Sequence, residues 1–220
     1  MLALLHTSPV HVPVFDALRD ADAPGLPLRH LVRPELLAGA RESGPEGVAG
    51  EVAEALGEAV RAGARAVLCT CSTLGSVAEA AGPTAGLPVL RVDRPMAAAA
   101  VAHGPRIAVL AALESTLTPT EELIAEEAHR AGRPARVRHV LVAGAWERFE
   151  AGDRAGYLAA VADAARRERD GGRADVLVLA QASMAPVAER CAAGGSGGNE
   201  VPVLASPRSG LRAAARLAGE

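Results

Sequence analysis

Hydrophobic and polar positions alternate along the chain in a pattern that predicts strands and helices in turn. Short apolar runs followed by polar turns are typical of buried strands, and we expect strands at residues 2–6, 66–70, 87–92, 106–110, 137–142 and 201–204, with one more shortly before residue 181. Amphipathic stretches between them predict helices, chiefly at residues 52–62, 72–81, 96–102, 120–131 and 157–169, with a stop for the second at Gly82-Pro83. Strands alternating with helices predict an α/β fold with mostly parallel sheets.

One segment of this pattern occurs twice, about 110 residues apart. Residues 64–79 and 174–189 both end in Val-Ala-Glu, and a Pro-Val-Leu follows each copy. Aligning the copies places Cys71 opposite Gln181. The repeat predicts two pseudosymmetric lobes, each a mostly parallel sheet flanked by helices, with Cys71 and Gln181 facing an active site in the cleft between them. We expect the first lobe to comprise residues 1–97 and 207–220, and the second residues 98–206.

Composition and charge limit the partners and the cellular location that we expect. The chain has 220 residues, half of them hydrophobic, and a net charge of -3 with acidic and basic residues interspersed. This charge and the scarcity of aromatic residues argue against a nucleic-acid partner. No run of 18 apolar residues is present, so we expect no membrane partner. Three cysteines, an odd number, argue against a disulfide framework and favour a cytoplasmic location.

Missing residue types exclude several chemistries. The chain contains no lysine, which removes Schiff-base and P-loop mechanisms. Its six histidines lack the spacing of metal ligands, and neither a GxGxxG nor an HExxH motif occurs. We therefore expect neither pyridoxal phosphate, nor a nucleotide bound on a P-loop, nor a metal. Gln181 is the only glutamine, which favours a specific hydrogen-bonding role at the end of a buried strand.

Small hydroxyl residues follow four of the predicted strands. In parallel α/β units, ligands bind beyond the carboxyl ends of strands, where helix N-termini direct N–H groups toward anions. Such positions suit a small carboxylate substrate. The alternative is that these side chains only cap helices. The candidate substrate-binding residues are Thr7, Ser8, Ser72, Thr73, Ser115, Thr116 and Ser183.

Cys71 is the candidate catalytic thiol. It lies at a strand-to-helix junction, where a helix dipole lowers the pKa of a thiol and favours the reactive thiolate. Cys69 and Cys191 are better explained as small buried apolar residues. Cys69 and Cys71 could also form a metal-binding pair, but the chain has no second pair.

The quoted segments resemble the aspartate/glutamate racemase superfamily, which includes hydantoin racemase, maleate isomerase and arylmalonate decarboxylase. Residues 67–73 are similar to its first Cys-Asn-Thr motif, with Cys71 on the catalytic cysteine, and residues 175–183 to its Gly-Cys-Thr-His motif, with Gln181 in place of the second cysteine. Residues 106–118 resemble the start of its second lobe. The resemblance implies two pseudosymmetric lobes, cofactor-free chemistry and often a homodimer, and it adds Ala182 to the substrate-binding positions.

The departures from the family pattern shape the expected reaction. Two-base racemases use a thiol on each face of the substrate, and an amide cannot abstract a proton, so Gln181 cannot be the second base. What remains is one-thiol chemistry next to a carboxylate or carbonyl: Cys71 could protonate an enediolate after decarboxylation, add to an activated double bond, or epimerise with water or His6 as partner, while Gln181 stabilises the oxyanion. The leading hypothesis is an isomerase of this superfamily. The alternatives are a decarboxylase of the arylmalonate type and a carboxylate-binding protein without catalytic activity.

Overall fold

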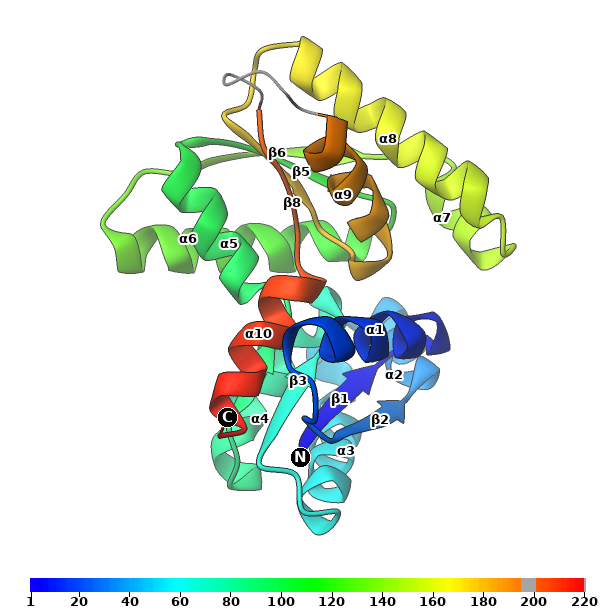
Figure 1. The fold of residues 1–220 in the computed structure, drawn as a ribbon, viewed down its shortest axis with the longest axis vertical. Coiled ribbons are helices and arrows are strands. Elements are labelled where there is room, and N and C mark those ends of the chain that lie inside the picture. The colour runs from blue at the N-terminus through cyan, green and yellow to red at the C-terminus, as the bar shows by residue number, and fades with distance from the viewer. Residues whose placement is uncertain (195–200, 220) are drawn as a thin grey trace. The chain divides into compact units, whose positions relative to one another are not determined.

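The computed structural model describes residues 1–194 and 201–219. The chain divides into two compact units, Met1–Pro95 with Pro207–Glu220 (unit 1) and Met96–Ser206 (unit 2). Each unit contains a four-stranded, wholly parallel sheet with helices on both faces (Figure 1). The α/β fold predicted from the sequence is confirmed.

The sheet of unit 1 has the strand order β2-β1-β3-β4. Its central strands carry apolar side chains on both faces, because both faces are covered by helices. Leu2 and Leu4 of β1 pack on one side, and Ala3 and Leu5 pack on the other. The strands are β1 (Leu2–His6), β2 (Leu28–Val32), β3 (Ala66–Cys69) and β4 (Val89–Arg91).

Two layers of helices enclose this sheet. The helices α1 (Val12–Asp22) and α10 (Pro207–Leu217) cover the face of Leu2 and Leu4. The opposite face is covered by α2 (Pro34–Ser43), α3 (Ala49–Arg61) and α4 (Gly75–Ala85). A short 3₁₀ segment follows the first and third strand of each unit, and a further one precedes α3. These segments are η1 (Pro9–His11), η2 (Pro45–Val48), η3 (Ser72–Leu74), η4 (Glu114–Thr116) and η5 (Ala182–Met184).

Unit 2 repeats this architecture with the strand order β6-β5-β7-β8. Its strands are β5 (Arg106–Ala111), β6 (Arg136–Leu141), β7 (Val176–Leu179) and β8 (Val203–Ala205). One face is covered by α5 (Arg94–His103) and α6 (Leu117–Ala131). The other is covered by α7 (Ala145–Glu150), α8 (Arg154–Asp170) and α9 (Ala185–Gly194).

The two sheets match residue for residue. Leu2 pairs with Ala66 in unit 1, and Ile107 pairs with Val176 in unit 2. The same N–H to carbonyl bonds then recur beyond the strand ends: Thr70 donates to Leu5, and Ala180 donates to Leu110. Leu74 donates to the carbonyl of Cys71, and Met184 to that of Gln181. Cys71 and Gln181 are therefore equivalent positions of one duplicated unit, as the sequence alignment predicted.

The structure corrects three local expectations. Strand β2 and helix α2 lie where no element was predicted, since Leu28–Val32 mixes charged and apolar residues and pairs on only one edge, with β1. Helix α4 does not stop at Gly82-Pro83 but continues to Ala85. Proline removes one backbone donor but keeps a helical φ, and the helix ends instead at Gly86, whose left-handed φ of 75° supplies the C-cap. Helix α3 begins at Ala49, three residues before the predicted start at residue 52.

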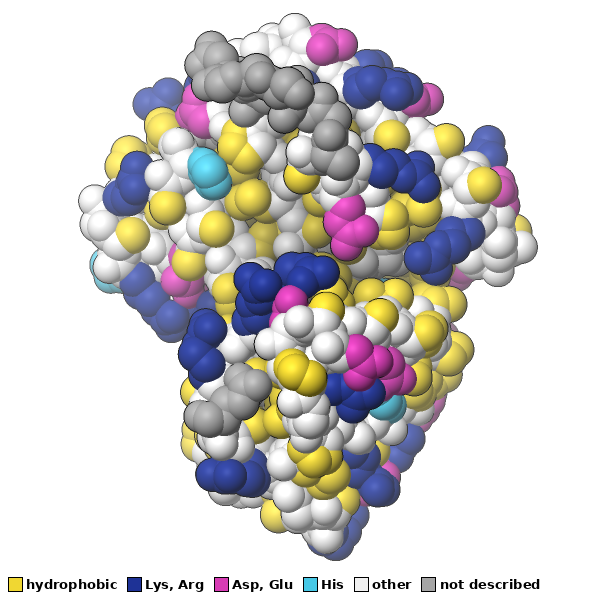
Figure 2. All heavy atoms as spheres, viewed as in Figure 1, with side chains coloured by type: hydrophobic (Ala, Val, Ile, Leu, Met, Phe, Trp, Pro, Cys, Tyr) yellow, Lys and Arg dark blue, Asp and Glu magenta, His cyan; other side chains and the backbone are white. Residues whose placement is uncertain are grey.

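Surface charge is mixed. Acidic and basic side chains are interspersed on the face drawn in Figure 2, in keeping with the net charge of -3. Within residues 1–194 and 201–219, no helix combines the length and the apolar character needed to cross a bilayer.

Candidate active site

Cys71 occupies the turn between β3 and α4. It has an extended backbone (φ -103°, ψ 115°) and precedes the single turn η3, after which α4 begins at Gly75. Its side chain is half-buried, whereas Cys69, two residues earlier on β3, is fully buried. The Cys69 thiol donates to the carbonyl of Cys71 over 3.6 Å. Of the two residues, only Cys71 retains solvent exposure.

Several donors converge on the sulfur of Cys71. The Thr7 side chain, the Thr73 side chain and the N–H groups of Thr73 and Leu74 all hydrogen-bond to it. These donors lower the pKa of the thiol, but burial raises it by more, so the net pKa lies above the ordinary value. The expectation that this position lowers the pKa of the thiol and favours the thiolate is therefore wrong. Cys71 rests as a thiol, surrounded by groups that would stabilise the thiolate once it forms.

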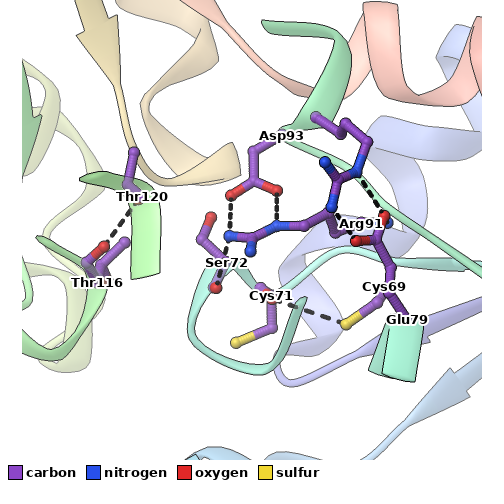
Figure 3. Close-up of polar contacts among 9 residues, drawn as sticks. Cys69, Cys71, Ser72, Glu79, Arg91, Asp93, Thr116 and Thr120 are labelled. Carbon is purple, nitrogen blue, oxygen red and sulfur yellow. Dashed lines mark hydrogen bonds and ion pairs between the residues drawn. The ribbon is translucent and has the colours of Figure 1, made fainter. Parts of the chain in front are cut away.

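A buried ion pair holds this turn in place. Arg91, at the end of β4, is 2% exposed and Asp93 is 0% exposed. The guanidinium donates to both carboxylate oxygens, at 2.7 and 3.0 Å, and its Nη2 also donates to the carbonyl of Ser72 at 3.3 Å (Figure 3). The Cys71 sulfur points away from this pair (Figure 3). The ion pair therefore fixes the backbone beside Cys71 without occupying its side chain.

The first residue of α4 must be small to admit this arginine. A Cβ added at Gly75 would lie 2.7 Å from the Nε of Arg91. Glu79, one turn later, accepts from the Arg91 backbone N–H at 3.0 Å and forms an ion pair with Arg94. The start of α4 is thus tied to the end of β4 by charged hydrogen bonds.

Gln181 lies at the equivalent turn of unit 2, between β7 and α9. Its Oε1 accepts from the N–H of Ala112 at 2.6 Å and from that of Leu113 at 3.4 Å, just beyond β5. This assignment places the carbonyl oxygen on the donors and leaves the amide NH₂ directed elsewhere. Gln181 itself therefore ties the ends of β5 and β7 together.

Ser183 is held by a residue that the sequence did not single out. Its hydroxyl lies 2.7 Å from the hydroxyl of Tyr157 on α8. Burial raises the pKa of Tyr157 to about 12, so the phenol stays protonated at neutral pH. Tyr157 therefore orients Ser183 as a neutral partner.

The remaining hydroxyl candidates divide between the two units. In unit 1, Thr7 and Thr73 both reach Cys71, and Ser8 precedes η1 without a side-chain capping bond. In unit 2, Thr116 precedes α6 without a side-chain capping bond, although its carbonyl accepts from Thr120. The Oγ of Ser115 is buried and has no hydrogen-bond partner in the described part of the chain. The alternative that these residues serve as side-chain caps finds no support at Ser8 or Thr116.

Ala182 and His6 offer no free side-chain group to a ligand. Ala182 is buried in η5 and offers no side-chain donor or acceptor. Both ring nitrogens of the fully buried His6 contact protein groups, Thr70 and His30. Residues 1–194 and 201–219 contain no group of three or more His, Cys, Asp or Glu side chains arranged to hold a metal ion. Sequence reasoning missed Arg91, Asp93, Tyr157 and His30, because their roles depend on contacts between distant elements.

Comparison with known proteins gives one family and a set of similar folds. The model of the family described as Asp/Glu/Hydantoin racemase matches residues 12–215. A solved structure of an aspartate racemase homologue from Pyrococcus horikoshii OT3 is 16% identical, with a TM-score of 0.66, covering 100% of this chain and 99% of that one. Glutamate racemase RacE1 from Bacillus anthracis is 18% identical, with a TM-score of 0.70 and coverage of 96% and 78%.

An arylmalonate decarboxylase structure is also similar, at 19% identity and a TM-score of 0.57, with coverage of 99% and 92%. At these identities the structural likeness shows a shared fold. None of the curated proteins compared matches the sequence at a significant level.

Proposed function

Since the chain belongs to the Asp/Glu/hydantoin racemase family, we propose that it is a cofactor-independent enzyme of the isomerase type acting at the carbon next to a carboxylate or carbonyl of a small acid. In this proposal Cys71 is the single catalytic thiol. The observation that carries the proposal is the set of four donors around the Cys71 sulfur, contributed by Thr7, Thr73 and Leu74. A buried cysteine that served only as packing would need none of them.

The resting thiol suits Cys71 to the role of general acid. It would give its proton to the carbon of a planar enediolate: the S–H bond breaks, a C–H bond forms, and the electron pair stays on sulfur. The thiolate so formed would be stabilised by the donors already in place, and it would regain a proton from solvent. In the reverse direction, the same thiolate would act as the base that removes an α-proton.

Gln181 would contribute a hydrogen bond rather than a proton. Its Oε1 is engaged by the N–H groups of Ala112 and Leu113, which orients the amide NH₂ as a fixed donor. A fixed donor of this kind can stabilise the negative charge that develops on a carboxylate or carbonyl oxygen. Because the amide has no basic lone pair, the second proton of a two-base racemisation must come from elsewhere.

A second candidate is decarboxylation of a malonate-type diacid. The protonated state of Cys71 favours it, since the enediolate left by loss of CO₂ needs a single proton donor. The fold similarity to arylmalonate decarboxylase is compatible with this reaction. Both candidates use the same thiol and differ in how the enediolate arises.

Incubation in D₂O distinguishes the candidates. Small dicarboxylates, amino acids, hydantoins and aryl-substituted malonates would be incubated with the protein, and deuterium at the α-carbon and loss of CO₂ followed by NMR. We expect one class to react and Cys71→Ser to lower the rate by roughly 10²- to 10⁴-fold, the range for losing a general acid–base group. Cys191→Ser is the matched control and should leave the rate unchanged. A carboxylate that binds without exchange or CO₂ loss would instead identify a binding protein.

A further inference from the structure

A chain of polar side chains runs from the surface of unit 1 to the segment that carries Cys71. Asp16 of α1 lies 3.3 Å from the Nε2 of His30 on β2. The Nδ1 of His30 lies 2.8 Å from the Nε2 of His6, whose Nδ1 lies 2.8 Å from the Oγ1 of Thr70. The Thr70 hydroxyl also lies 3.1 Å from the carbonyl of Leu5.

Counting protons shows when all of these contacts can exist together. The Leu5 carbonyl only accepts, so the single proton of the Thr70 hydroxyl points toward it, and the Nδ1 of His6 must donate to Thr70. His6 is fully buried, and burial together with His11 and His30 lowers its pKa to about 3, so His6 is neutral and its Nε2 must accept. His30 then donates from both nitrogens, one to His6 and one to the Asp16 carboxylate. The complete chain therefore requires a doubly protonated His30.

Removing one proton from the doubly protonated His30 reverses the direction of the hydrogen bonds. A neutral His30 keeps the proton that Asp16 requires on Nε2, so its Nδ1 becomes an acceptor. His6 must then donate from Nε2, and its Nδ1 must accept from Thr70. The Thr70 hydroxyl leaves the Leu5 carbonyl, so two hydrogen bonds change direction and a third is lost.

The far end of the chain adjoins the proposed catalytic thiol. The bond between His6 and Thr70 joins the end of β1 to the end of β3. The next residues along these two strands are Thr7 and Cys71, and the Thr7 side chain hydrogen-bonds to the Cys71 sulfur. The direction and strength of the first bond thus bear on the alignment of the second.

We infer that His30 is a positioning residue. Its protonation state sets the direction of the chain through His6 and Thr70, and so the placement of Thr7 against the Cys71 sulfur. The effect on catalysis rests on the proposed role of Cys71, whereas the reversal of the chain does not. The inference does not require Asp16, His30, His6 or Thr70 to touch the substrate.

Charged side chains lie near His30 on both faces of the sheet. On the same face of the sheet lie Asp16 and Arg19 of α1, which are 3.6 Å apart, and His11 of η1, whose ring centroid is 6.1 Å from that of His6. The other face carries the charged groups Arg29, Arg33 and Glu58, which pair with one another. Asp16 is the carboxylate in contact with His30, and replacing it with a neutral side chain should therefore disfavour the imidazolium.

Histidine-selective ¹⁵N NMR tests the reversal directly, without any substrate. Spectra would be recorded across about pH 5 to 8, the range in which histidine commonly changes charge. We expect His6 to carry its proton on Nδ1 on the acid side and on Nε2 on the alkaline side, with the same midpoint as the titration of His30. Asp16→Asn should shift both midpoints to lower pH. A single His6 tautomer throughout the titration of His30 would overturn the inference.

Alkylation of Cys71 by iodoacetamide tests the positioning. In the wild type, the logarithm of the rate plotted against pH should show a step at the His30 midpoint, which His30→Gln abolishes. His139 on β6 is the equivalent position in unit 2 and contacts Glu121 there, so His139→Gln is the matched control and should retain the step. A purely structural role of His30 would change the rate by one factor at every pH. An unchanged profile shape in His30→Gln would therefore contradict the inference, even if the protein proved to be an active enzyme.

Discussion

The turns after β3 and β7 are equivalent parts of a duplicated unit, yet they are stabilised in opposite ways. In unit 1, the buried pair of Arg91 and Asp93 holds the Ser72 carbonyl, and the side chain of Cys71 stays directed away from it. In unit 2, Gln181 holds its own turn by accepting from Ala112 and Leu113. Where a separate residue holds the turn, the side chain at the strand end remains available for reaction.

The residues around these two turns differ between the units in a concerted way. The register of the sheets places Ala205 of unit 2 where unit 1 has Arg91. Helix α4 begins with Gly75, which leaves room for the arginine side chain, whereas α9 begins with Ala185. The backbone bonds are common to both units, but the turn is supported by Arg91 in unit 1, whereas unit 2 has an alanine at that position and uses Gln181.

The largest expected effect concerns the ion pair of unit 1. Arg91→Met would leave the Asp93 carboxylate buried without its partner, and we expect a loss of about 3–5 kcal/mol in the free energy of unfolding. Urea denaturation measures this loss. The double variant Arg91→Met/Asp93→Leu should lose much less, since no charge is left uncompensated. Equal losses in both variants would show that packing, not charge, dominates at this position.

Gln181 provides the next test. Gln181→Ala should lower turnover on the true substrate by roughly 10²- to 10³-fold, the scale for losing one oxyanion donor. Gln181→Glu keeps an oxygen to accept from Ala112 and Leu113 but loses the NH₂ donor, so it should be impaired to a similar degree while retaining the stability of the wild type. Steady-state kinetics and thermal unfolding of the two variants separate donation to substrate from support of the turn. Full activity in Gln181→Glu would show that the Gln181 amide does not donate to the substrate.

Gln181→Cys makes the two units chemically alike. We expect it to confer or increase racemisation, because a second thiol becomes available to return a proton. The measurement is solvent deuterium entering both enantiomers of a bound acid. Gln181→Ser is the matched control, since it loses the same amide without gaining a thiol, and racemisation that rises equally in both variants would count against the two-thiol explanation.

Thiol reactivity should also distinguish Cys71 from the other two cysteines. Cys69 is fully buried and its pKa is strongly raised by that burial, while Cys191 lies against the apolar cluster of unit 2. We expect iodoacetamide to label Cys71 faster, by about 10-fold or more, since a partly exposed cysteine with thiolate-stabilising donors reacts more readily. Because burial also raises the pKa of Cys71, its labelling rate should keep rising with pH beyond the range of a free thiol. Peptide mass spectrometry of partly labelled protein decides, and equal labelling or a preference for Cys191 would argue against a catalytic Cys71.

The smallest expected effect is that of Tyr157→Phe. The change removes the hydroxyl that contacts Ser183 while keeping the ring that packs in unit 2. We expect a destabilisation of about 0.5–1.5 kcal/mol, the typical net value of one hydrogen bond. Chemical denaturation measures it, and a loss well above this range would mean that the ring itself is displaced.

Much of the fold could be predicted from the sequence, because strong periodicity needs no knowledge of tertiary contacts. Residues 2–6 and 66–70 were identified as buried strands by their apolar runs, and the structure places β1 and β3 there. Strand β2 was missed, since a half-exposed edge strand such as Leu28–Val32 carries charged residues that hide its pattern. The end of α4 was misplaced because a proline in the last turn of a helix does not end it by itself.

The sequence by itself determined the duplication, the family and the contrast between a thiol and an amide at equivalent strand ends. These follow from the order of residues along two similar segments. Only the tertiary structure decided the protonation of Cys71, the support of its turn and the chain from Asp16 to Thr70. The pKa of a thiol depends on the balance between burial and donors from other segments. A series of hydrogen bonds depends on contacts of about 3 Å between residues that are up to 64 positions apart in the sequence.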